Sequence, residues 1–68
     1  MALIEVYEDK DATQPLFVTG FDFTPRVGEY LARDTDGYFR YYKVVEVWHR
    51  QDAPQGTFRA CLRVTLDD

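Results

Sequence analysis

The chain has 68 residues, a formal net charge of −4 and a single cysteine. A chain of this length forms one domain, residues 1–68, and buries only about 60% of its unfolded surface on folding. One cysteine excludes an intrachain disulfide, which favours a reducing compartment, and we expect a cytoplasmic protein. No apolar run approaches the ~20 residues of a membrane helix, so we expect no membrane partner.

Composition and charge narrow the function classes further. The sequence contains no serine, which excludes a serine nucleophile, and it contains eleven aromatic residues, which together with the valines favour β-strands. Residues 1–25 carry a charge of −4, residues 26–63 carry +2, and the tail Asp67-Asp68 adds −2. The net negative charge disfavours nonspecific attachment to nucleic acid.

The first half of the chain predicts two strands and a turn. The first strand covers about residues 2–8 and the second about residues 16–24, where alternate positions carry aromatic residues on one face. Gly20 in the middle of the second strand predicts a bulge or a sharp bend. Pro25-Arg26-Val27-Gly28 then forms a turn.

The second half predicts three strands. A strand over about 29–34 is followed by Asp36-Gly37, the strongest hairpin signal in the sequence. The strand over 38–50 is too long to stay straight in a domain of this size, and we expect a bulge near Tyr42-Lys43-Val44 that turns Val45 and Val47 inward. A strand over about 57–66 completes the set.

The last strand alternates between an apolar face, which includes Leu62 and Val64 and is expected to cover the core, and a mixed face, and this pattern allows a register to be predicted. Pairing Arg50 with Thr57 places His49 opposite Phe58 and Trp48 opposite Arg59. This pattern predicts an all-β fold, either a five-stranded small SH3-like barrel or a strongly bent antiparallel sheet.

Residues 27–47 carry a family resemblance. The stretch Val27-Gly28-Glu29-Tyr30-Leu31-Ala32, the turn Asp36-Gly37 and the aromatic run Tyr38-Phe39-Arg40-Tyr41 resemble the opening of SH3-like barrels of the Tudor type. The resemblance implies a small barrel. The last strand lacks the acidic-aromatic-glycine element of those domains.

The sequence contains few side chains that could act in catalysis or bind a metal ion. The only imidazole is His49, and the predicted register places it on the face opposite to Cys61, which disfavours a Cys-His dyad. One histidine and one cysteine do not make a structural zinc site, and the alternating acids at 9–11 and 34–36 lack the closing glutamate of a calcium loop. We therefore expect a protein that is not an enzyme and that needs neither metal nor cofactor.

Two sets of side chains are candidates for binding. Four aromatic residues near the second and third strands could form a cage for a methylated lysine or could belong to the core: Phe23, Tyr30, Tyr38 and Tyr42. A basic and aromatic strand face could contact a partner or stack the bases of single-stranded nucleic acid, and it consists of Arg40, Tyr42, Trp48, Arg59 and Arg63. Trp48 and Arg59 could instead form a cation–π pair within the domain.

The number of aromatic residues favours one function. A barrel of 68 residues cannot enclose eleven rings, and exposed tyrosine and tryptophan are typical of protein interfaces. We expect a noncatalytic interaction module that binds a protein partner or a second copy of itself. The alternatives are a single-stranded nucleic-acid binder and an acidic inhibitor that mimics phosphate in a basic site.

Overall fold

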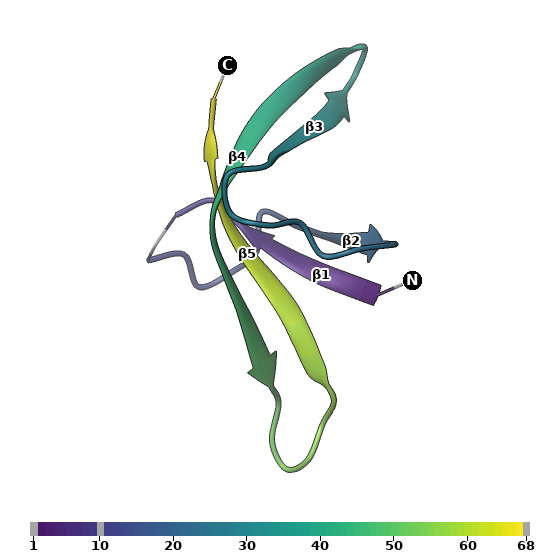
Figure 1. Cartoon of the computed structure of the whole chain (residues 1–68), viewed down its shortest axis with the longest axis vertical. Helices are drawn as coiled ribbons and strands as arrows, with labels where there is room; N and C mark the ends of the chain where they lie inside the picture. Colours follow the sequence, from purple (N-terminus) through teal and green to yellow (C-terminus); the bar gives the residue numbers. More distant parts are fainter. Residues whose placement is uncertain (1, 10, 68) are drawn as a thin grey trace.

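The computed structural model describes residues 2–9 and 11–67, so Lys10 and Asp68 of the predicted charge pattern lie outside the described residues. All regular structure in these residues is β-strand (Figure 1). The strands are β1 (Ala2–Tyr7), β2 (Phe17–Phe21), β3 (Tyr30–Thr35), β4 (Tyr38–Gln51) and β5 (Phe58–Leu66).

The five strands form one strongly curled sheet in the order β2-β1-β5-β4-β3, a half-barrel. This confirms the predicted all-β fold with a bent sheet. The sheet is mixed, because β1 runs parallel to β5, whereas the other three pairs are antiparallel. The connection between β2 and β3 carries the chain from one edge of the sheet to the other, and Pro25 within it is fully buried.

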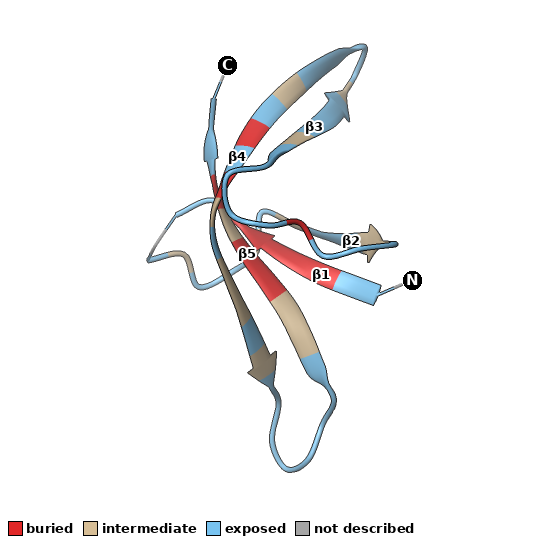
Figure 2. Ribbon diagram, in the orientation of Figure 1, coloured by how far each residue is buried: buried red, intermediate tan, exposed pale blue. Residues whose placement is uncertain are grey.

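The core lies on the inner face of the curl. Alternation along β1 and β5 turns every second side chain inward, so Ile4, Val6, Leu62 and Val64 are each 0% exposed. Tyr42 and Val44 of β4 complete the cluster. Figure 2 shows that the buried residues gather where β1, β4 and β5 meet, whereas the two hairpin ends extend into solvent.

The predicted break in β4 is present, one residue further along the chain. The β4–β5 register shifts between Val44 and Glu46, which marks Val45 as the extra residue of a bulge. Tyr42 and Val44 therefore point inward before the bulge, and Val47 points inward after it. The prediction that Val45 faces the core is wrong, because the bulge absorbs this residue and leaves it partly exposed.

The predicted register of the last hairpin is wrong by two residues. Gln51 pairs with Phe58, Arg50 with Arg59 and Trp48 with Cys61. A shift of two preserves which face each side chain occupies, so the alternating pattern cannot distinguish the two registers. The turn decides the register, and the Gly56 amide closes it by donating to the Asp52 carbonyl at 2.8 Å.

Turn chemistry confirms one prediction and corrects another. Asp36 and Gly37 have φ values of 54° and 99°, so both central residues of the β3–β4 turn lie in the left-handed region that Asp-Gly favours. Gly20, in contrast, pairs with Leu3 in an unbroken β1–β2 ladder, so the predicted bulge is absent there. β2 also ends at Phe21, earlier than the sequence predicts.

Candidate functional site

The outer face of the sheet holds a buried carboxylate. Glu5 projects from β1 and is only 6% exposed. Arg50 meets it through two bonds of 2.8 Å, from Nη1 to Oε1 and from Nη2 to Oε2, while Nη1 of Arg59 donates to Oε2 at 3.0 Å. The Tyr7 hydroxyl donates to Oε1 at 2.7 Å. Two guanidinium groups and a phenol thus satisfy the buried charge.

These contacts, together with burial, shift the pKa values of Glu5, Tyr7 and Cys61. Hydrogen bonds from Arg50 and then from Tyr7 lower the pKa of Glu5 to about 2, although burial opposes the shift. The pKa of Tyr7 is raised by its bond to Glu5 and by burial. Burial, followed by the charge of Glu5, raises the pKa of Cys61. At neutral pH the Glu5 carboxylate is therefore ionised and paired with the arginines, whereas Tyr7 and Cys61 stay protonated.

The five residues that were predicted to form one basic and aromatic face lie on two opposite faces of the sheet. Trp48, Arg59 and Arg63 lie together on the outer face, because Trp48 pairs with Cys61 and the two arginines flank that cysteine on β5. Tyr42 is instead a core residue, 5% exposed, and Arg40 lies on the same side of β4 as Tyr42. The single face predicted for all five residues is therefore wrong, because it required one side-chain phase along β4.

The internal cation–π pair predicted for Trp48 and Arg59 is replaced by other contacts. Arg59 binds Glu5, and the Trp48 ring packs against Tyr7 with ring centroids 5.6 Å apart. The two-residue change of register causes this difference, because it places Cys61 rather than Arg59 opposite Trp48. Arg63 pairs with Glu46 at 3.0 Å.

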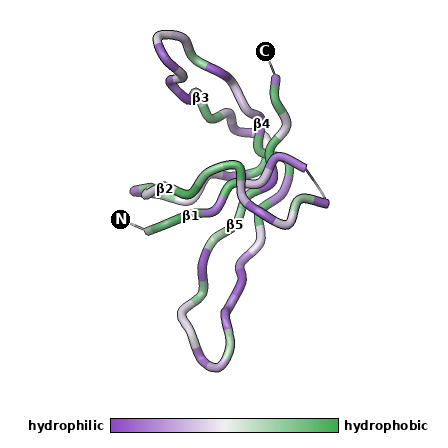
Figure 3. The backbone as a smooth tube through the Cα atoms, turned by 180° about the vertical axis from the view of Figure 1, so that it is seen from behind, coloured by the Kyte–Doolittle hydropathy of each residue, from purple (hydrophilic) through white to green (hydrophobic). Residues whose placement is uncertain are grey.

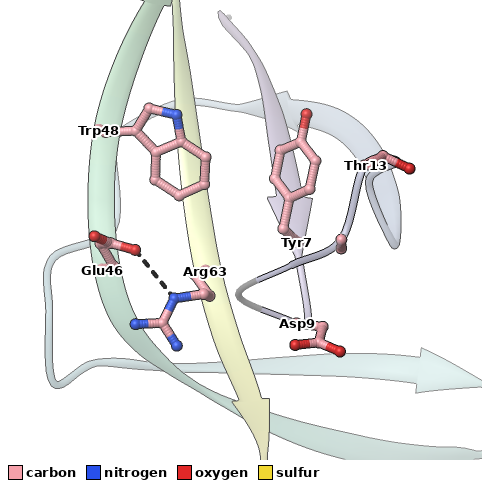
Figure 4. Close-up of a pocket in the computed structure, with 7 residues that line it drawn as sticks. Tyr7, Asp9, Thr13, Glu46, Trp48 and Arg63 are labelled. Atoms are coloured by element: carbon pink, nitrogen blue, oxygen red, sulfur yellow. Dashed lines mark hydrogen bonds and ion pairs between the residues drawn. The ribbon is translucent and has the colours of Figure 1, made fainter.

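A hollow of about 330 Å³ opens beside this ring pair. Figure 4 shows the rings of Tyr7 and Trp48 along one side and the Glu46–Arg63 ion pair below Trp48. The loop after β1 forms the other wall with Asp9, Ala12 and Thr13. The side chains that line this hollow are mostly polar, and Arg63 among them is already paired with Glu46.

A second hollow, also about 330 Å³, lies between the two edge strands where the half-barrel stays open. We call it the seam groove. Its β2 wall continues into Phe23, and its β3 wall ends at Arg33, whose guanidinium carbon lies 4.2 Å from the centre of the Phe17 ring. Figure 3 shows hydrophobic residues along the β1 and β2 segments. The groove is lined by Phe17, Thr19, Phe21, Phe23, Tyr30, Leu31, Ala32 and Arg33.

The predicted aromatic cage is divided in the same way. Phe23 and Tyr30 line the seam groove and are 68% and 54% exposed, whereas Tyr42 is buried and Tyr38 lies at the far end of the β3–β4 hairpin. The sequence predicted that Phe17, Phe21 and Phe23 share one face, and these rings line the groove together. It did not predict that Tyr30 of the opposite edge strand joins them.

The candidate catalytic side chains Cys61 and His49 lie on opposite faces of the sheet. Cys61 lies on the outer face with its sulfur 3.8 Å from Oε1 of Glu5, and His49, paired with Ala60, lies on the inner face as predicted. Within residues 2–9 and 11–67, no group of three or more histidine, cysteine or acidic side chains is placed to hold a metal ion. The same residues form no helix long and apolar enough to cross a membrane.

Comparison of the chain with models of protein families, with curated proteins and with solved structures finds no match.

Proposed function

We propose that this chain is a noncatalytic interaction module that binds a protein partner through the seam groove. The observation that carries the proposal is the open side of the half-barrel, where aromatic side chains from both edge strands line one groove. Apolar grooves with a few polar groups are the usual form of a binding site, and exposed aromatic residues are enriched at interfaces.

Exposure at the groove supports this function. Phe23 and Tyr30 leave more than half of their surface in water, although each sits beside other apolar side chains. A partner that covers these rings would remove apolar surface from water, which stabilises a complex by about 25 cal/mol for each Å². The rings therefore supply the anchors that interfaces concentrate in a small area.

We include in the same proposal a relationship to SH3-like barrels of the Tudor type. It is supported by the β3–β4 hairpin, whose Asp36-Gly37 turn and aromatic strand coincide with the resembling stretch 27–47. The half-barrel fold does not depend on this relationship.

Capture of a partner from lysate of cells that contain this chain tests the function. The immobilised wild type is compared with Phe23→Ala/Tyr30→Ala, which removes two exposed rings of the groove that are not members of the buried core cluster. Phe58→Ala is the matched control, because Phe58 is 67% exposed and lies on β5, outside the groove lining. We expect the wild type and the control to capture the same protein and the double variant to lose it. Equal capture by all three would contradict the groove as the site.

Single-stranded nucleic acid is a second candidate, favoured by the hollow on the outer face. Tyr7 and Trp48 present neighbouring rings there with Arg63 beside them, and bases stack on such rings. Arg50, Arg59 and Arg63 each already face a carboxylate, so phosphate would have to compete for them. Quenching of Trp48 fluorescence by an oligothymidylate at low salt would support this candidate, and unchanged fluorescence would reject it.

A further inference from the structure

The two edges of the sheet differ in how they are protected. Edge strands expose unpaired backbone groups, and proteins usually blunt them with charged residues or proline. β3 carries Arg33 and Asp34, whereas β2, with the sequence Phe-Val-Thr-Gly-Phe, has neither a charge nor a proline. β2 is therefore the edge on which another strand can add.

Building on the proposed function, we infer that the strand that adds is β2 of a second copy, in an antiparallel pair centred on Thr19. The sequence of β2 is close to symmetric about this residue, with phenylalanine at both ends. A two-fold axis at Thr19 places Phe17 opposite the partner's Phe21, and the same contact repeats on the other side of the axis. Aromatic cross-strand pairs stabilise antiparallel sheets.

The outer face of β2 is complementary in the same register. Val18, which is 44% exposed, lies opposite the partner's Gly20. Gly20 pairs with Leu3 of β1, and Leu3 is 53% exposed, so the missing side chain at Gly20 leaves room next to an apolar neighbour. The partner's Val18 fills this room and covers Leu3. This contact gives a reason for a glycine in the middle of an edge strand, where close approach of another backbone is typical.

Charge is compatible with this register although each copy carries −4. β2 itself is uncharged, and Asp22, the nearest acid after it, lies opposite the partner's Leu16 rather than opposite another acid. Like charges therefore do not meet directly across the pair. Repulsion between the copies acts at a longer range and is screened by salt, so the dimer is expected to strengthen as salt is raised.

Sedimentation equilibrium over a range of concentrations tests the inference. We expect the wild type to form dimers and Thr19→Lys to weaken them at least about tenfold, because two lysines then face each other across the axis. Thr19 is exposed, so the variant is expected to keep the wild-type circular dichroism spectrum. Thr57→Lys, at an exposed threonine just before β5 and outside the groove lining, is the matched control and is expected to leave the dimer unchanged.

The register has its own test. Because Thr19 lies opposite the partner's Thr19, a mixture of Thr19→Lys and Thr19→Glu is expected to restore the dimer that each variant alone has lost. A wild type that stays monomeric up to about 1 mM would overturn the inference, as would a Thr19→Lys variant that dimerises like the wild type. If the monomer still captures a partner through Phe23 and Tyr30, the proposed function is supported and only the dimer through β2 is rejected. If neither association occurs, both the dimer and the proposed function are rejected.

Discussion

The Glu5 carboxylate and the Arg50 guanidinium meet through two parallel hydrogen bonds of 2.8 Å, although 45 positions separate the residues along the chain. Glu5 belongs to β1 and Arg50 to β4, and β5 lies between them in the sheet. The pair therefore joins three strands on the outer face, opposite the apolar core. A domain this small has a limited core, so a second set of contacts across its central strands matters for stability.

Stability is expected to fall in acid because of Glu5. Its pKa is about 2 in the folded chain against an ordinary value of 4.5, so the ionised carboxylate stabilises the fold above pH 4.5, and this contribution is lost as the pH falls toward 2. A shift of this size corresponds to about 3 kcal/mol. Urea unfolding at pH 7, 4.5 and 3 measures the loss, and Glu5→Gln should flatten the dependence. An equal slope in both proteins would contradict the role given to Glu5.

The bulge in β4 predicts unequal effects for two adjacent valines. Val44→Ala removes a side chain that is 0% exposed and is expected to cost about 2–3 kcal/mol in the free energy of unfolding. Val45→Ala changes the partly exposed bulge residue and is expected to cost less than about 1 kcal/mol. Chemical denaturation of the two variants provides the measurement. A larger loss of stability in Val45→Ala than in Val44→Ala would contradict the assignment of Val45 as the bulge residue.

Gly37→Ala is expected to destabilise the β3–β4 hairpin by about 1–2 kcal/mol, because Gly37 has a φ of 99°, which L side chains rarely adopt. Free space surrounds the position, so the cost comes from backbone conformation alone. Asp36→Gly, at the neighbouring φ of 54°, relieves strain instead and is expected to change stability by less than about 1 kcal/mol. Thermal unfolding compares the two variants. Equal losses of stability would contradict the left-handed conformation that the β3–β4 turn requires at Gly37.

Cys61 is expected to resist modification in the folded chain. The thiol is fully buried, and burial together with the charge of Glu5 raises its pKa, so little thiolate forms at neutral pH. Reaction with a chromogenic disulfide reagent at pH 7.5 should be slow in buffer and complete within minutes in urea. Fast reaction in buffer would show that the outer face opens readily or that the thiol is exposed.

Local signals predicted much of this fold. Asp36-Gly37 determines its hairpin because few residues accept two consecutive left-handed conformations, and the alternation of β5 correctly assigned Leu62 and Val64 to the core. The approximate place of the bulge followed from the charge of Lys43, which could not be buried. These are features that neighbours in the sequence decide.

Features that depend on distant residues were missed. The parallel pairing of β1 with β5 leaves no local pattern, and a register shift of two residues changes no face. Glu5 alternates with the core residues Ile4 and Val6, and no local pattern shows that its carboxylate is buried on the outer face. Two arginines on one outer face, Arg50 and Arg59, were the available signal that a buried carboxylate needed partners. The seam groove depends on how strongly the sheet curls, and no local pattern in the sequence predicts this curvature.

Amide hydrogen exchange, followed by NMR at two protein concentrations, tests the open half-barrel most directly. At low concentration, alternate amides of β2 and of β3 should exchange quickly, because each edge strand has a neighbour on one side only, whereas β5 amides should be protected. At high concentration, the unprotected amides of β2 should become protected and those of β3 should not. Full protection of β2 at the lower concentration, or equal behaviour of the two edges at both, would contradict the account.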